Sequence, residues 1–307
     1  MADSATKPLA GNPPSVLARL RAWAGGLARP AGAPAPPPRA MTPQPDREAV
    51  VAPLDRATIG QWLWGKGFVS PGDEQYVLEM VKPFGLTPAM SMLDLSAGLG
   101  GPARVIAKAF GTYVTGLERS PERAKRGMQM SVEANLAKRA TISQYNPETI
   151  ELRPNSFDCI LGRGTTYSIV EKERLFRVVY QGLKQRGQLL FNEFTVDPAF
   201  ADRPELAAWM ARESFPPALW SIEQYQDCLT SLGFDIRVVA DVTAIYRSMI
   251  VAGWARMLKE VDLKAMARNH LITVINEAEL WMLRIAALQS GALHVYRVHA
   301  ILNKPSR

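Results

Sequence analysis

The residue types that build metal centres, disulfide frameworks and membrane spans are scarce in this sequence of 307 residues. Only two cysteines and three histidines occur, and neither type shows metal-ligand or redox spacing, so we expect no metal site and no disulfide framework. Cys159 and Cys228 lie in apolar segments, which predicts buried free thiols in a reducing compartment such as the cytoplasm. No apolar run approaches the roughly 18 residues that cross a bilayer.

Acidic residues are almost missing from residues 1–45, where only Asp3 opposes the lysines and arginines. This segment therefore supplies part of the formal charge of +7, and the remainder of the chain is only mildly basic. Nucleic-acid-binding domains usually gather Lys and Arg on one element, interleaved with aromatic residues. Because no such cluster is present, we expect no nucleic-acid partner.

Residues 1–45 differ in composition from everything after them. Pro and Ala dominate residues 29–45, which predicts a disordered basic tail. Ahead of that stretch, Val16, Leu20 and Trp23 recur at helical spacing between arginines. Three interpretations stay open for this tail: a functionless extension, a peripheral contact with an anionic membrane surface, and an organelle-targeting peptide.

From residue 86 onward, short apolar runs alternate with amphipathic helical patterns. This alternation predicts an α/β fold with a doubly wound, mainly parallel sheet that carries helices on both faces. In the helix after residue 120, Ala124, Met128, Val132 and Leu136 are expected to face the core. The expected strands cover residues 91–97, 113–118, 141–146, 157–162, 187–194, 234–242 and 294–302.

The same pattern divides residues 46–307 of the chain into three parts of one domain. Residues 46–85 form an expected N-terminal helical cap, and residues 86–195 an expected cofactor-binding core. Residues 196–307 carry the last strands around a helical stretch, 244–290, that is rich in Met, Leu and Trp. A plain helical core and a flexible apolar lid over a substrate are both compatible with this stretch.

The segment LDLSAGLGG, residues 93–101, ends the first expected strand and leads into a helix. In a doubly wound sheet, ligands bind beyond the carboxyl ends of the strands, where glycines let the backbone approach the ligand closely. Glu118 ends the next expected strand, where its carboxylate can accept hydrogen bonds from ribose hydroxyls. Together these features predict a nucleoside site.

Two nucleosides compete for this site. Gly98, Gly100 and Ala103 satisfy the G-x-G-x-x-A pattern of dinucleotide sites. Against a dinucleotide stand the acidic Asp94 and the proline at Pro102, which removes a helix N–H that a pyrophosphate would use. A cationic sulfonium ligand suits the acid better, so S-adenosylmethionine is favoured, with a ligand-free structural turn as the further alternative.

The chain resembles the class I S-adenosylmethionine-dependent methyltransferases across about residues 58–305. The segments 93–122, 155–164 and 183–194 carry this resemblance through their order and spacing. Within that superfamily, WGKGFVSPGDEQYVLEMV resembles the phosphoethanolamine N-methyltransferase group and its small-molecule relatives. The resemblance implies a Rossmann-like sheet of seven strands with an antiparallel last strand, and a helical insertion that covers the substrate.

The resemblance also implies the site. In the phosphoethanolamine group a tyrosine stands at the position of Phe68 and a histidine at that of Ser168, and together they assist amine deprotonation. With both replaced, the base is unassigned, and Glu193 and Tyr167 are the candidates. The implied acceptor pocket contains Phe68, Tyr167 and Ser168, and the implied cofactor contacts are Asp94, Ser96, Gly98, Gly100, Gly101, Glu118, Arg119, Asn146, Gly162 and Arg163.

The implied activity is in-line transfer of a methyl group from S-adenosylmethionine to a small-molecule or lipid-like acceptor. Three readings explain the replaced pair: an acceptor that is already deprotonated, a base from elsewhere in the chain, or a catalytically silent cofactor-binding or scaffold protein. Whether nitrogen, oxygen or carbon accepts the methyl group stays open, as does the oligomeric state.

Overall fold

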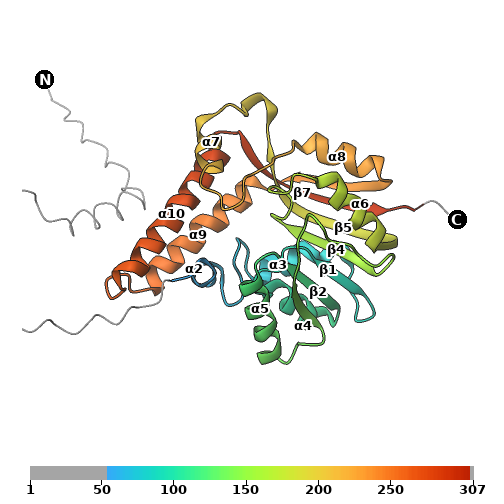
Figure 1. The fold of residues 1–307 in the computed structure, drawn as a ribbon, viewed down its shortest axis with the longest axis horizontal. Coiled ribbons are helices and arrows are strands. Elements are labelled where there is room, and N and C mark those ends of the chain that lie inside the picture. Colours follow the sequence, from blue (N-terminus) through green and yellow to red (C-terminus); the bar gives the residue numbers. More distant parts are fainter. Residues whose placement is uncertain (1–53, 305–307) are drawn as a thin grey trace, which may run out of the picture.

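The computed structural model describes residues 54–304, in which strands and helices alternate along the chain (Figure 1). The predicted basic tail lies outside the described residues. The strands are β1 (Ser91–Asp94), β2 (Tyr113–Glu118), β3 (Ala140–Gln144), β4 (Phe157–Arg163), β5 (Leu183–Val196), β6 (Phe234–Asp241) and β7 (Leu293–Leu302).

Helices fill the connections between these strands, and two of them precede β1. The helices are α2 (Arg56–Trp64), α3 (Glu74–Val81), α4 (Gly101–Phe110), α5 (Pro121–Glu133), α6 (Lys172–Gly182), α7 (Pro204–Met210), α8 (Ile222–Ser231), α9 (Thr243–Glu260) and α10 (Arg268–Gln289). Two short 3₁₀ turns, η1 (Lys82–Phe84) and η2 (Pro198–Phe200), lie at the end of α3 and after β5.

The strands form one seven-stranded sheet in the order β3-β2-β1-β4-β5-β7-β6. The strands β1 to β5 pair in parallel, whereas β7 runs antiparallel to both of its neighbours, β5 and β6. The strand order reverses at β1, which is paired with β2 on one side and β4 on the other. The predicted doubly wound sheet with an antiparallel last strand is confirmed, and this reversal is where ligands of such sheets bind.

Successive residues of each central strand point to opposite faces of the sheet. In β1, Met92 joins a large core cluster shared with α3, α4 and α10, whereas Leu93 joins a second cluster shared with α6 and α8. In β4, Leu161 and Ile160 divide in the same way. Burial on both faces explains why these strands read as continuous apolar runs.

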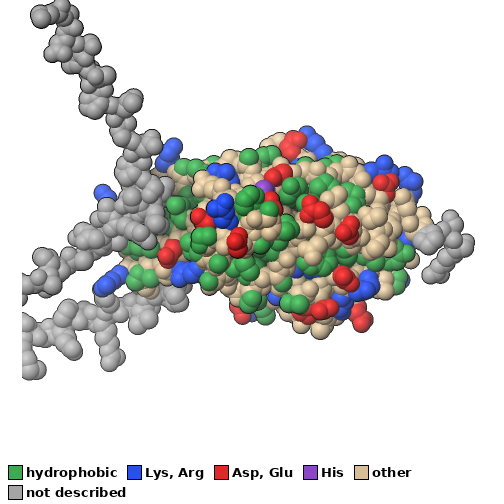
Figure 2. All heavy atoms as spheres, turned by 90° about the horizontal axis from the view of Figure 1, so that it is seen from above, with side chains coloured by type: hydrophobic (Ala, Val, Ile, Leu, Met, Phe, Trp, Pro, Cys, Tyr) green, Lys and Arg blue, Asp and Glu red, His purple; other side chains and the backbone are tan. Residues whose placement is uncertain are grey.

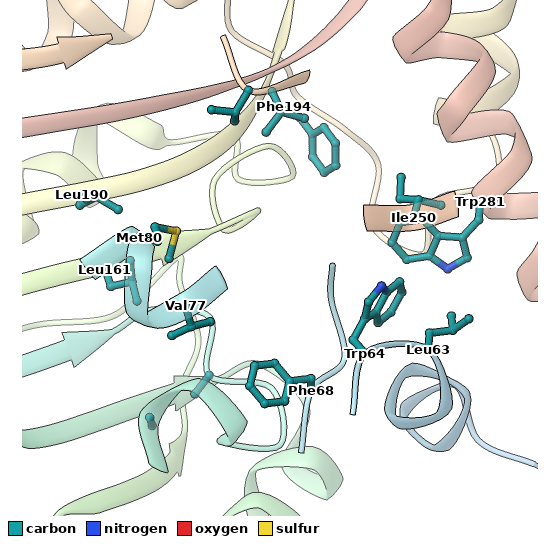
Figure 3. Packing of buried hydrophobic residues seen from close by; sticks show 14 of the residues in the cluster. Leu63, Trp64, Phe68, Val77, Met80, Leu161, Leu190, Phe194, Ile250 and Trp281 are labelled. Carbon is teal, nitrogen blue, oxygen red and sulfur yellow. The ribbon is translucent and has the colours of Figure 1, made fainter. Parts of the chain in front are cut away.

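The predicted helical insertion is the hairpin of α9 and α10, which leans on the N-terminal helix α2 (Figure 1). Trp64 of α2 packs edge-on against Trp281 of α10 with ring centroids 4.8 Å apart, and both rings lie beside Ile250 of α9 (Figure 3). A Cβ atom on Gly253 would lie 2.9 Å from the backbone oxygen of Leu63, so α9 approaches α2 as closely as only glycine permits.

Local signals in the sequence placed the helix ends well. Ser120 caps α5, and Ser221 with Gln224 forms a capping box at the start of α8. The expected inner face of α5 is wrong at Val132, whose side chain is exposed, because the helix instead turns Gly127 and Ser131 toward the sheet. Those small residues let α5 lie close to the glycine loop after β1.

Charged side chains are spread over the surface of the described residues. On the face shown in Figure 2, acidic and basic side chains are interspersed with apolar ones and form no stripe of one sign. Of the two thiols, Cys159 is buried as predicted and Cys228 is half-buried, and both are free. Among the described residues, no helix is long and apolar enough to cross a bilayer.

Candidate cofactor crevice and acceptor cavity

The glycine loop after β1 is shaped by close backbone approach. Gly98 and Gly100 both have positive φ, 57° and 75°. A Cβ atom on Gly98 would lie 2.5 Å from Cγ2 of Val69, and one on Gly101 would lie 2.6 Å from the backbone oxygen of Gly67. The segment of residues 65–72 therefore covers the loop, and the N–H of Gly101 at the start of α4 donates to Gly67 rather than standing free.

Asp94 at the end of β1 has one carboxylate oxygen that accepts a hydrogen bond from the described residues and one that does not. The side chain is fully buried. Its Oδ1 accepts from the backbone N–H of Ser96 at 3.0 Å, whereas Oδ2 is buried and has no partner among the described residues. Burial raises the pKa of Asp94, and the nearby charge of Arg163 opposes that rise. A buried carboxylate oxygen beside a glycine loop fits the amino group of a cationic ligand.

Glu118 at the end of β2 is arranged in a similar way. Its Oε1 accepts from the N–H of Ser120 at 2.8 Å and from Nη2 of Arg123 at 2.5 Å. Every hydrogen bond that the Glu118 carboxylate accepts from the described residues ends on Oε1. Its Oε2 is therefore left for hydroxyl groups such as those of a ribose.

The remaining predicted cofactor residues gather around the same strand ends. Ser96 accepts from the backbone N–H of Arg163 at 2.8 Å, which ties the loop after β1 to the end of β4. Gly162 is buried, and a Cβ atom there would lie 3.2 Å from Oγ1 of Thr165. Asn146 is exposed, and its Oδ1 already accepts from the N–H of Glu148, so a second lone pair is what it offers a ligand.

Arg119 joins the crevice to a loop far along the chain. Its Nη1 donates to Oγ of Ser168 at 2.9 Å, and its guanidinium lies 4.0 Å from the ring centroid of Phe215. Ser168, which was expected in the acceptor pocket, thus contacts Arg119 after β2 and is not among the residues that line the cavity described next.

A cavity of about 260 Å³ opens next to the crevice. Most of its wall comes from elements remote in sequence: α2, residues 69–71, the ends of β4 and β5, residues 213–215, α9 and α10. Its aromatic wall contains Trp64, Tyr76, Tyr167, Phe194, Phe215, Tyr246 and Trp281. The charged and amide wall contains Arg56, Arg123, Arg163, Asn192, Glu193, Glu213, Glu277 and Arg284.

Of the residues predicted for the acceptor pocket, Tyr167 alone lines this cavity. Its hydroxyl donates to Oε2 of Glu213 at 3.2 Å, and burial followed by the charge of Glu213 raises its pKa. Phe68 lies instead in the hydrophobic core, where its ring points toward Val77 and the glycine loop (Figure 3). A phenyl ring without a polar atom packs there at no hydrogen-bonding cost.

Glu193, the other candidate base, acts as a cap for the loop after β4. Its Oε2 accepts from the backbone N–H groups of Thr165 and Thr166 at 2.9 and 2.5 Å and from the Thr166 hydroxyl at 2.8 Å. Its Oε1 accepts from the N–H of Phe194 at 2.9 Å. Burial raises the pKa of Glu193 while these donors lower it. A carboxylate whose lone pairs face donors of the protein is ill suited to take a proton from a substrate.

One loop, residues 211–220, contacts both the crevice and the cavity. Ser214 accepts from Nη1 of Arg56 at 2.8 Å, and the N–H of Ala218 donates to the carbonyl of Tyr167 at 2.7 Å. The buried ammonium of Lys172 links this loop to the segment after β4, because it donates to the carbonyls of Ala218 and Ile169.

The histidines of the last strand have structural partners, as the sequence suggested. His294 contacts Asp241 at 3.0 Å and His299 contacts Gln188 at 2.8 Å. No group of three or more potential metal ligands occurs within residues 54–304.

Sequence reasoning missed several residues that line the site. Arg123 had a signal, because it follows Glu118 by five positions on the first turn of α5. Glu213 and Arg284 had none, because they are 71 positions apart and meet only in the folded chain.

Comparison with known proteins identifies relatives of this chain. Phosphoethanolamine N-methyltransferase 2 of Caenorhabditis elegans is 31% identical over 135 residues, which are 44% of this chain and 31% of that protein. Phosphoethanolamine N-methyltransferase 1 of Arabidopsis thaliana is 28% identical over 207 residues, 65% of this chain and 40% of that protein. The chain therefore spans less than half the length of these relatives.

Among solved structures, phosphoethanolamine N-methyltransferase 2 of Haemonchus contortus, in complex with S-adenosyl-L-methionine, has the same fold. It superposes with a TM-score of 0.70 at 22% identity and covers 81% of this chain and 57% of its own. The model of the mycolic acid cyclopropane synthetase family matches residues 74–296. Since that match spans most of the sequence, the chain belongs to the mycolic acid cyclopropane synthetase family.

Proposed function

We propose that this chain binds S-adenosylmethionine in the crevice beside β1 and β2 and transfers its methyl group to a small-molecule or lipid-like acceptor in the adjacent cavity. The observation that carries the proposal is the pair of carboxylate oxygens, Asp94 Oδ2 and Glu118 Oε2, that accept no hydrogen bond from the described residues. They lie at the ends of neighbouring strands on either side of a glycine loop.

The residues fit this ligand group by group. The Asp94 oxygen would accept from the ligand amino group, and the Glu118 oxygen from a ribose hydroxyl. The glycine loop would let the backbone lie against the ligand. Relatives named as N-methyltransferases, and a structural neighbour solved with S-adenosyl-L-methionine, support the same assignment.

When bound, S-adenosylmethionine supplies a methyl group that its positively charged sulfur already activates. The protein therefore has to align the acceptor and exclude water. The aromatic wall and the loop of residues 211–220 would serve both purposes. Because the candidate bases are engaged, Glu193 as a cap and Tyr167 as a donor to Glu213, we infer that the acceptor atom carries no proton at neutral pH. The two free cysteines support a reducing compartment such as the cytoplasm.

Calorimetry with S-adenosylmethionine tests the proposal. Glu118→Ala should weaken binding at least about tenfold, because a charge-assisted hydrogen bond contributes about 1.5 to 3 kcal/mol. Glu122→Ala is the matched control: this carboxylate is exposed on the first turn of α5, four positions after Glu118, and its removal should leave affinity unchanged. Equal affinity of the unaltered chain and Glu118→Ala, with both folded, would contradict the ribose assignment.

A further inference from the structure

In the cavity wall, some arginine N–H groups have no hydrogen-bond partner among the described residues, whereas the carboxylate oxygens all accept hydrogen bonds from the protein. Three acids line it, Glu193, Glu213 and Glu277. Glu193 accepts four hydrogen bonds from its own loop and strand, as described above. Glu277 accepts from Nε of Arg56 at 2.5 Å and from Nε1 of Trp281 at 2.9 Å, so both of its oxygens are engaged by the wall.

Glu213 is engaged in the same manner. Its Oε1 accepts from Nε1 of Trp209 at 2.6 Å and from the guanidinium of Arg284, and its Oε2 accepts from Tyr167. No acid in the wall therefore offers an unengaged carboxylate oxygen to a cationic ligand.

Arginines in the wall, in contrast, keep unused donors. Arg284 is 7% exposed, and its Nε–H has no partner among the described residues although the side chain lines the cavity. The Nε–H of Arg163 is likewise buried without a partner, and its Nη1 reaches only Ser70, at 3.5 Å. A buried N–H without an acceptor is unfavourable, and an acceptor atom of a ligand would remove that cost.

The Arg284 guanidinium also occupies the place where aromatic rings would hold a cation. It lies 4.2 Å from the ring centroid of Trp281, 5.3 Å from that of Phe194 and 5.9 Å from that of Trp209. Clusters of rings at such distances bind ammonium groups of ligands. Here a side chain of the protein fills the cluster, and the charge of Glu213 raises the pKa of Arg284 against the lowering effect of burial.

We propose that Arg284 sets the specificity of this cavity, so that it takes an acceptor with an anionic group, carboxylate or phosphate monoester, on an apolar body and rejects acceptors whose head is an ammonium. The inference rests on the proposed function and specifies the chemical class of the acceptor. A cationic head would meet a buried guanidinium and no unengaged acid, which disfavours it by charge repulsion and desolvation together.

Three ligands with one tail and different heads test this inference: octanoate, octyl phosphate and octyltrimethylammonium. Each is titrated calorimetrically into the full chain in the presence of S-adenosylhomocysteine. The expected result is that at least one of the two anions binds tenfold or more tightly than the ammonium, and the comparison of the two anions identifies the head. Binding of the ammonium as tight as that of both anions, or no binding of either anion, would overturn the inference.

Removing Arg284 alone would strand Glu213 as a buried charge, so the test uses the double variant Glu213→Gln/Arg284→Met, which neutralises both partners at once. We expect the preference to invert: affinity for the anion falls at least tenfold, and the emptied ring cluster binds the ammonium more tightly than the unaltered chain does. An unchanged order of affinities in the folded variant would refute the role of Arg284.

Two controls separate the possible failures. Arg237→Met removes an exposed arginine of β6 that pairs with Asp235, and it should leave the anion preference unchanged. Titration with S-adenosylmethionine reports on the crevice independently of the cavity. A chain that binds this cofactor but shows no anion preference disproves the inference alone, whereas a chain that fails to bind it disproves the proposed function.

Discussion

The crevice and the cavity lie side by side but are built in different ways. The crevice is made by residues close in sequence, Asp94 to Gly101 and Glu118, whose backbone conformation is set by glycines with positive φ. The cavity is made by side chains from separate elements, which meet through long-range pairs such as Glu213 with Arg284. The comparison shows that backbone geometry shapes the crevice, whereas side-chain chemistry shapes the cavity.

The largest expected effect concerns the backbone of the crevice. Gly98→Ala adds a Cβ atom 2.5 Å from Val69 at a φ of 57°. Strain and overpacking of this kind cost about 2 to 3 kcal/mol, so the dissociation constant for S-adenosylmethionine should rise about a hundredfold in calorimetry. Gly85→Ala is a matched control, because Gly85 has the same φ of 57° and its new Cβ atom would meet no other atom within 4 Å. Equal losses of affinity in both variants would show that close approach at Gly98 is irrelevant.

The next prediction distinguishes a structural role of Glu193 from a role as a catalytic base. Glu193→Gln turns one acceptor oxygen into a donor that faces the N–H groups of Thr165 and Thr166. We expect the free energy of unfolding in urea to fall by about 2 kcal/mol. Full stability combined with lost turnover would instead identify Glu193 as a base.

A smaller effect is expected from the lysine beneath the loop of residues 211–220. Burial lowers the pKa of Lys172 from 10.5 to about 8, so the folded chain releases this proton at a lower pH than the unfolded chain does. Between about pH 8 and pH 10.5 the unfolded state binds more protons, and the contribution of Lys172 to stability therefore rises with pH.

Urea unfolding of the unaltered chain and of Lys172→Met, at about pH 7 and about pH 8.7, measures this contribution. The difference in unfolding free energy should shift by about 1 kcal/mol in favour of the unaltered chain at the higher pH. Parallel pH profiles would mean that Lys172 keeps an ordinary pKa.

The smallest effect concerns the contact that joins the two sites. The guanidinium of Arg119 and the ring of Phe215 form a partly exposed cation–π pair. A double-mutant cycle of Arg119→Gln and Phe215→Leu on S-adenosylmethionine binding should give a coupling energy of about 0.5 to 1 kcal/mol. Strict additivity of the two substitutions would show that this loop does not affect the crevice.

The sequence predicted the fold because the fold depends on local patterns, and the residues expected around the nucleoside follow from the same patterns. Alternating apolar runs reflect strands buried on two faces, and the glycines with Asp94 and Glu118 fall within one βαβ unit. Prediction failed where packing decides. Val132 matches a helical period yet is exposed, because α5 presents small residues to the glycine loop. Phe68 matches a pocket position in a motif yet packs in the core.

The cavity could not have been predicted from one sequence. Its charged wall depends on which arginine meets which acid, and partners such as Arg56 and Glu277 are separated by 221 positions. Periodicity identifies the face of a helix that is buried, but it carries no information about the element that covers it. The hairpin of α9 and α10 was therefore expected either as a helical core or as a lid over a substrate, without the side chains that it places in the wall.

The loop of residues 211–220 has a consequence for how two ligands would bind. It contacts α2 through Ser214, Arg119 through Phe215, and the cavity wall through Glu213. Any ligand that tightens one attachment changes the freedom of the other two. Under the proposed function, cofactor and acceptor would then be thermodynamically linked, each raising the affinity of the other by the same factor whichever of them binds first.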